Sequence, residues 1–342
     1  MRCNFAHPAC GLVAAFLIFS CGGSVRGQVL FNEIMFHPPP AIPEDTRKEW
    51  LELFNASTAA VNLDGWRLTK GVGFNFTNTT IAAGGWLVVA ADLATFQANY
   101  PGVTNAVGGW TGKLSNGGEK IELTDNLGQV ADAVSYASDG DWALLRLGEI
   151  YPGQPTWWRG WGWTNEADGG GKSVELINPA LSNKPGQNWK ASLVAGGTPG
   201  RANSVASDDI APLILDVQHV PAIPHSTDSV TITAQILDEA VSSVTVQLFS
   251  RVDGAASFAA TPMFDDGAHG DGVADDGYFG AVLPPQPDKT VVEFYIRATD
   301  AAGHTRTWPR PCTIARCGWD SLSSSAFPRA TPSRKITSGT AS

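Results

Sequence analysis

The sequence predicts an all-β protein built from two tandem immunoglobulin-like β-sandwiches. Its 342 residues are enough for two domains of about 100 to 200 residues each. Short stretches of alternating apolar and polar residues are separated by turns, to which 37 glycines and 22 prolines contribute, as in antiparallel sheets. We therefore expect a signal peptide (1–27), a first sandwich (28–204), a linker (205–212), a second sandwich (213–309) and a disordered or truncated tail (310–342).

The N-terminus is typical of a secretory signal peptide. A basic Arg2 precedes an apolar run at 11–19, which is too short to span a bilayer. We expect cleavage near Gly27, so that the mature protein is secreted or held at the cell surface. The alternative is a lipoprotein anchored at Cys21. No later apolar run reaches 18 residues, which predicts that no transmembrane segment follows.

Strand patterns begin directly after the predicted signal peptide. Leu51 and Leu53 alternate with the residues between them, and 86–90 is an entirely apolar stretch that follows a glycine turn. One short helix is expected at 92–100. No cysteine lies between 22 and 311, so both sandwiches must be stabilised by their hydrophobic cores and not by disulfides.

Several sequence blocks of the first sandwich carry a family resemblance. Five ordered blocks resemble the successive strands of a lamin-tail domain, and three later blocks are similar to the ending of secreted bacterial members. The resemblance implies an immunoglobulin-like β-sandwich that works as a binding module, with no catalytic residues to transfer. The blocks are VLFNEI (29–34), EWLELFN (49–55), VNLDGWRL (61–68), GGWLVVA (84–90), LSNGGEKIELTD (114–125), SVELINP (173–179), NW (188–189) and GGTPGRAN (196–203).

The second sandwich is predicted from about seven short strands in 100 residues. Val230, Ile232, Ala234 and Ile236 alternate with polar residues over one of them. The domain resembles the fibronectin type III-like or immunoglobulin-like module that precedes CotH-type kinase domains in large exported bacterial proteins. The blocks that carry this resemblance are DDG (265–267), GDG (270–272), DGYFG (276–280) and EFYIRATD (293–300).

A group of tryptophans in the glycine-rich stretch 142–171 is a candidate binding surface. Flat indole rings stack on the apolar faces of sugars and anchor protein interfaces. The alternative is a local core beneath a long loop, which is the commoner outcome. The candidate binding residues are Trp157, Trp158, Trp161 and Trp163.

The acidic, glycine-rich loop 265–277 is a candidate calcium site. Hard oxygen ligands clustered on a flexible loop suit Ca²⁺, although the spacing is not that of an EF-hand. The alternative is a polar turn in which Asp and Gly supply the backbone conformations that the turn requires. The candidate ligands are Asp266, Asp271 and Asp276.

Composition and motifs exclude several classes of function. A net charge of −10 argues against a nucleic-acid partner, because such proteins need a basic surface. The sequence lacks the His-Glu-x-x-His zinc motif, cysteine and histidine zinc spacings, and the Gly-x-Ser-x-Gly nucleophile motif, so we expect no enzyme and no cofactor other than calcium.

These observations favour an exported, non-catalytic binding or adhesion protein. Its lamin-tail domain is expected to act as an interaction module for a glycan or a cell-envelope protein. The first alternative is an N-terminal accessory part of a larger CotH-type kinase-like surface protein. The second is a calcium-stabilised carbohydrate-binding module.

Overall fold

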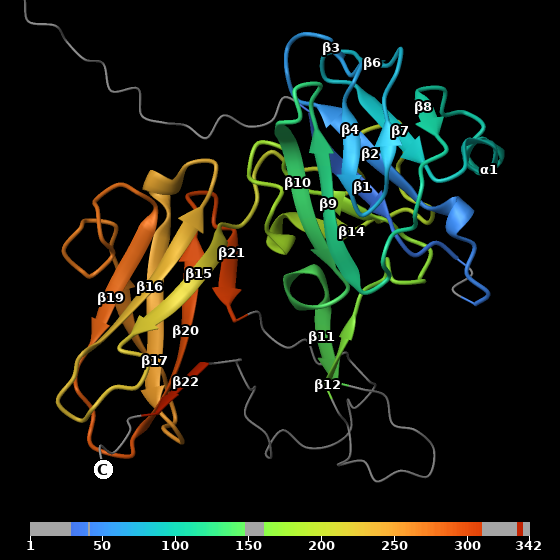
Figure 1. The fold of residues 1–342 in the computed structure, drawn as a ribbon. Coiled ribbons are helices and arrows are strands. Elements are labelled where there is room, and N and C mark those ends of the chain that lie inside the picture. The colour runs from blue at the N-terminus through green and yellow to red at the C-terminus, as the bar shows by residue number, and fades with distance from the viewer. Residues whose placement is uncertain (1–28, 40–41, 148–160, 310–333, 338–342) are drawn as a thin grey trace, which may run out of the picture.

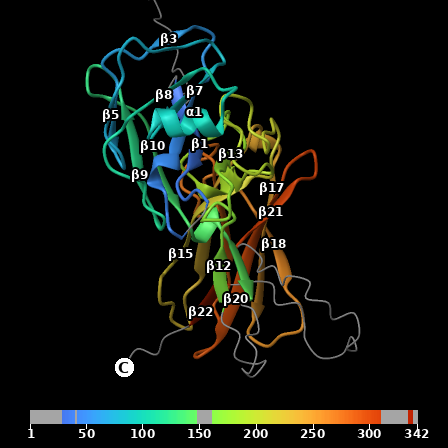
Figure 2. The ribbon, with the colours of Figure 1, turned by 90° about the vertical axis from the view of Figure 1, so that its right-hand side faces the viewer.

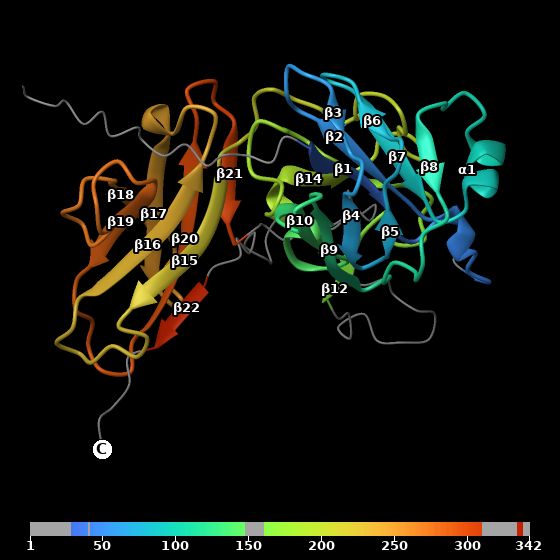
Figure 3. The ribbon, with the colours of Figure 1, turned by 45° about the horizontal axis from the view of Figure 1, so that its top comes forward.

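The chain folds into two β-sandwiches that lie side by side (Figure 1). This computed structural model describes residues 29–39, 42–147, 161–309 and 334–337. The predicted fold class is confirmed, because strands paired into sheets form almost all of the regular structure. Figure 3 shows that helix α1 (Leu93–Asn99) lies at the end of the first sandwich remote from the second.

The first sandwich consists of a six-stranded sheet packed against a four-stranded sheet. Neighbouring strands are antiparallel except for the parallel pair β7 and β8. The larger sheet has the order β14 (Trp189–Ala191), β13 (Val174–Leu176), β1 (Val29–Met35), β2 (Trp50–Asn55), β7 (Trp86–Ala90) and β8 (Ala106–Gly108). The smaller sheet has the order β10 (Val130–Ala137), β9 (Gly118–Thr124), β4 (Arg67–Lys70) and β5 (Phe74–Asn75), and β3 (Val61–Asn62) pairs separately with β6 (Thr80–Ile81).

The central strands of the larger sheet are buried on both faces. One face contributes Leu51 and Leu53 to the main core. On the other face, Trp50 packs with Val88 and with Phe96 of α1, which lies over β7 and β8 in Figure 2. The helix begins after Asp92, whose carboxylate accepts a hydrogen bond from the Thr95 amide at 2.7 Å.

The second sandwich has one sheet of three strands facing one of five. Alternate residues of β16 are buried, as the sequence pattern predicts, and they pack against Leu248 and Ile296 of the facing sheet. The smaller sheet has the order β15 (Leu213–Val220), β16 (Val230–Leu237) and β19 (Tyr278–Leu283). The larger has the order β18 (Ala259–Met263), β17 (Thr245–Val252), β20 (Val291–Thr299) and β21 (Thr305–Trp308).

A short strand from the C-terminal segment joins the larger sheet of the second sandwich. Residues Arg334–Thr337 form β22, which pairs antiparallel with Val291–Phe294 of β20. The expected disordered or truncated tail includes these four residues, which instead use backbone groups that β20 leaves unpaired beyond the end of β21.

Polar and apolar contacts join the two sandwiches at the linker. The side-chain amide of Gln187 makes the two hydrogen bonds to Ile214 that the backbone of a neighbouring strand would make. Its N–H donates to the Ile214 carbonyl at 2.8 Å, and its oxygen accepts from the Ile214 amide at 3.0 Å. Next to it, Leu181 packs with Ile210 and Leu213. The two sandwiches therefore share a small buried junction.

Candidate functional site

A cavity of about 390 Å³ opens at the junction of the two sandwiches. One wall comes from the 3-10 helix Gly140–Trp142 and from the hairpin of β11 (Leu144–Leu147) and β12 (Trp161–Thr164), which extends away from the first sandwich in Figure 1. Residues of β14 and Arg306 of β21 also line the cavity. We call this cavity the junction cleft.

Two tryptophans pack together at the junction cleft. The ring centroids of Trp142 and Trp189 lie 5.3 Å apart, with a 32° angle between the ring planes. Trp189 is buried and donates its indole N–H to the Asn183 carbonyl at 2.7 Å, whereas Trp142 is half-buried. A side chain at Gly186 would clash with Trp142, since its Cβ would lie 2.6 Å from the ring. The position of the more exposed indole ring is therefore well defined.

Basic side chains outnumber acidic ones around the junction cleft. Lys172 forms an ion pair with Glu166, and Lys172 lowers the pKa of this carboxyl with a smaller contribution from Arg146. The second acidic group, Asp141, accepts a hydrogen bond from the Gln187 amide at 3.0 Å. The basic residues that line the cleft are Arg146, Lys172, Lys190 and Arg306.

Arg306 connects the second sandwich to the linker and to the first sandwich. Its guanidinium donates to the carbonyls of Pro212 at 2.8 Å, Ala211 at 3.2 Å and Gln187 at 3.4 Å. These carbonyls accept from Nε and Nη2 and carry no net charge, and the guanidinium itself brings a positive charge to the cleft. Arg306 thereby combines a junction contact with a place in the cleft wall.

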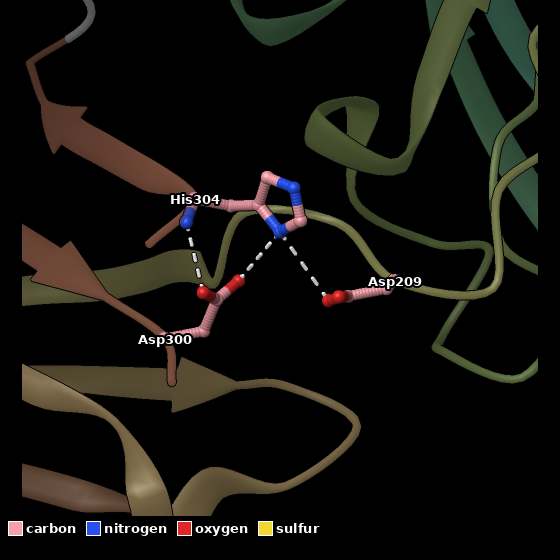
Figure 4. A group of neighbouring side chains, drawn as sticks. All are labelled: Asp209, Asp300 and His304. Carbon is pink, nitrogen blue, oxygen red and sulfur yellow. Dashed lines mark hydrogen bonds and ion pairs between the residues drawn. The ribbon is translucent and has the colours of Figure 1, made fainter. Parts of the chain in front are cut away.

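A second polar group lies close to the linker (Figure 4). His304 Nδ1 is 3.0 Å from Asp300 Oδ2 and 3.4 Å from Asp209 Oδ1, while the His304 amide donates to Asp300 Oδ1 at 2.8 Å. The hydrogen bond and charge of Asp300, with a smaller contribution from Asp209, raise the pKa of His304. Within the described ranges, this is the only group of three histidine, cysteine or acidic residues whose ligand-type atoms lie within 4.8 Å of one another.

The structure describes part of the predicted aromatic surface. Trp163 lies on β12 opposite Leu145 and is 49% exposed. The backbone of Trp161 belongs to the same strand, whereas its side chain lies outside the described part of the chain, as do Trp157 and Trp158 altogether. Whether these tryptophans bind a ligand stays a prediction, but Trp163 is exposed on a hairpin that begins beside the junction cleft.

The three candidate calcium ligands are not brought together by the structure. Asp271 is buried and accepts hydrogen bonds from the amides of Asp266, Gly267 and His269 at 2.7–3.1 Å. Asp266 pairs with His269 at 2.9 Å, and Asp276 accepts from the Tyr278 amide at 2.9 Å. In the described chain these carboxylates organise the turn, and calcium binding stays a prediction.

A row of three buried glutamates in the first sandwich was missed by sequence reasoning. Glu33 of β1 pairs in register with Glu175 of β13 on one side and with Glu52 of β2 on the other, and all three are 0% exposed. Burial raises the pKa of Glu33 to about 8, and it raises that of Glu52 well above its usual range. We call these three residues the glutamate row. In the sequence, the only sign of this row is that a Glu stands inside each of three apolar strand blocks.

The glutamate row accepts hydrogen bonds from the segment 197–205, which covers it. Glu33 Oε1 accepts from the Thr198 amide at 2.8 Å, and Glu52 Oε2 accepts from the Gly200 amide at 2.5 Å. Thr198 Oγ1 lies 2.8 Å from Glu175 Oε1 and 3.2 Å from Glu33 Oε2, and its single proton serves one of them at a time. These contacts are structural, because every carboxyl group in the row is occupied by the chain's own donors.

Comparison with known families identifies a domain in each sandwich. Residues 23–138 match the lamin tail domain, and residues 216–307 match the second immunoglobulin-like domain of conditioned medium factor. No curated protein matches the chain significantly. Both tryptophans of the junction cleft lie outside the two matched ranges.

Proposed function

We propose that this protein is an exported, non-catalytic binding module that attaches to a glycan through the junction cleft. The observation that carries the proposal is the half-buried ring of Trp142, held by Trp189 and Gly186 at the wall of a 390 Å³ cavity. Pockets of this size accommodate small ligands, and a fixed aromatic ring offers an apolar face to a pyranose.

Two further observations support the proposal. Trp163 is 49% exposed on the hairpin that borders the cleft, and a longer glycan chain leaving the cleft can contact it. Lamin tail and immunoglobulin-like domains are compatible with a binding role. No helix in the described residues is long and apolar enough to cross a membrane.

The predicted signal peptide supports export, and an N-terminal sequence of the mature protein tests it. A new N-terminus near Gln28 is the expected result, whereas a retained Met1 would contradict export. Adhesion at the cell surface is the corresponding biological role. The alternative of an accessory part of a CotH-type kinase-like protein stays a prediction, which the neighbouring DNA sequence tests.

A glycan array followed by calorimetric titration tests the binding function. We expect Trp142→Ala to weaken binding of the selected glycan about tenfold or more, because it removes the ring from the cleft wall. Trp66→Ala is a matched control, since Trp66 is also half-buried against the same core but does not line the cleft. The proposal fails if no glycan binds, or if the two variants weaken binding equally.

A further inference from the structure

We propose that the junction cleft is selective for an anionic saccharide, specifically a glycan that contains uronate residues. This inference rests on the proposed function, because it names the class of glycan that the same cleft binds. It combines two features of the cleft wall: an aromatic face that suits the sugar ring and an excess of cationic side chains that suits a carboxylate.

The charge around the cleft is opposite in sign to that of the whole protein. The chain has a net charge of −10, yet four basic and two acidic side chains line this cavity. Local charge of one sign in a concave site concentrates ligands of the opposite sign. An acidic protein that gathers basic groups around one cavity therefore favours an anionic ligand there.

The acidic groups offset only part of the positive charge of the wall. Glu166 is paired with Lys172. Asp141 accepts the neutral amide of Gln187 and keeps its charge, so the basic residues still outnumber the acidic ones by two. Among described residues, Arg146 and Lys190 have no ion-pair partner within 4.0 Å. These two cations are the groups we assign to a ligand carboxylate.

The geometry of the side chains suits a carboxylated sugar better than a neutral one. Arg146 offers a planar guanidinium, which binds a carboxylate through two parallel hydrogen bonds, and Lys190 offers a mobile ammonium group on β14. Arg306 adds positive charge from the second sandwich while its N–H groups hold the linker. In this arrangement, the sugar ring contacts Trp142 and the carboxylate meets Arg146 and Lys190.

Charged and esterified forms of the same polysaccharide test the selectivity. Isothermal titration of the full chain with polygalacturonate and alginate is compared with titration of their ester derivatives, which keep the sugar backbone but lose the charge. We expect the uronates to bind about tenfold or more tightly than the esters, with affinity that falls as salt concentration rises. Dextran sulfate is included to separate carboxylate selectivity from general attraction to polyanions.

Two charge variants and one control locate the effect. Arg146→Gln and Lys190→Gln should each weaken uronate binding about tenfold and should weaken ester binding much less, because the ester lacks the charge that these residues meet. Lys70→Gln removes the same charge at an exposed position on β4, away from the cleft, and should retain wild-type affinity. Circular dichroism checks that each variant is folded, and Lys190→Gln provides the exposed alternative if Arg146→Gln does not fold.

Each outcome separates this inference from the proposed function. If esters bind as tightly as uronates and binding depends on Trp142, the cleft is a glycan site but its anionic selectivity is wrong. If dextran sulfate binds as tightly as the uronates and loses affinity in the same two variants, the site selects anions in general and the uronate assignment is wrong. If no acid, ester or array glycan binds, both proposals are wrong.

Discussion

The first sandwich buries two neighbouring glutamates, whereas the second exposes an aspartate on a loop. In the first, Glu33 and Glu52 lie side by side on neighbouring strands under a covering segment, and burial raises the pKa of both. In the second, Asp266 lies on an exposed loop, where a hydrogen bond from His269 lowers its pKa. The pKa of a carboxyl group therefore depends on the strand or loop that carries the group. Burial penalises the charged form and raises the pKa, whereas nearby hydrogen-bond donors favour the charged form and lower it.

The hydrogen-bond donors to buried acids of the two sandwiches also differ in their distance along the chain. Glu175 accepts hydrogen bonds from Thr198, Ser204 and Val205, which lie 23 to 30 residues along the chain. Asp271 also accepts three hydrogen bonds, but all come from within its own loop. Glu175 therefore joins distant parts of the first sandwich, whereas Asp271 organises one turn of the second.

The largest expected effect comes from removing one acid of this matched pair. Glu175→Ala removes the acceptor of the Ser204 hydroxyl and the Val205 amide and leaves Thr198 with Glu33 alone. We expect it to lower the free energy of unfolding of the first sandwich by about 3 kcal/mol. Asp271→Ala should cost about 1 kcal/mol, because water can reach the loop amides. Urea unfolding followed by tryptophan fluorescence measures both, and equal losses would contradict the comparison.

The pH dependence of the first sandwich follows from the raised pKa of Glu33. A carboxyl whose folded pKa is about 8, against 4.5 when unfolded, stabilises the fold fully below pH 4.5. That contribution is lost as the pH rises from 4.5 toward 8, so we expect the free energy of unfolding of the first sandwich to fall across this window.

Urea unfolding at several pH values measures this loss. Glu33→Gln, which cannot titrate, should flatten the dependence, although it also changes the hydrogen bonds to Ser173 and Thr198. A stability that rises steadily between pH 5 and pH 8 would contradict the assignment.

The smallest expected effect concerns the junction. The raised pKa of His304 means that its pairing with Asp300 and Asp209 stabilises the junction below pH 6.5 and is lost as the pH rises through the folded pKa. His304→Gln should therefore lower the melting temperature slightly at pH 6 and leave it unchanged at pH 8.5. Differential scanning calorimetry at both pH values measures the shift, and an equal shift at both would assign His304 a role independent of charge.

Much of the fold was predictable because strand alternation is a local property. Val230, Ile232, Ala234 and Ile236 all lie in the core, as their spacing predicts. The helix at 92–100 was also predictable, since Asp92 is an N-cap residue. The larger sheet of the first sandwich differs from simple alternation, because α1 and the segment 197–205 cover the face that would otherwise be exposed.

The candidate site was predictable only in part. The sequence draws attention to tryptophans in the stretch 142–171, and Trp163 is indeed exposed on that hairpin. The partner of Trp142 is Trp189, a residue 47 positions further along the chain, and no spacing rule connects the two. Arg306 was not a candidate, because its place in the cleft depends on how the second sandwich docks against the first.

The sequence by itself determined the strands, the two sandwiches and the resemblance to a lamin-tail domain, because these depend on residues that are close along the chain. The tertiary structure alone decided that Trp142, Trp189 and Arg306 share one cavity and that Glu33, Glu52 and Glu175 form one buried row. The physical reason is that burial and charge depend on what covers a side chain. For Glu33, the covering residue is Thr198, which lies 165 positions away.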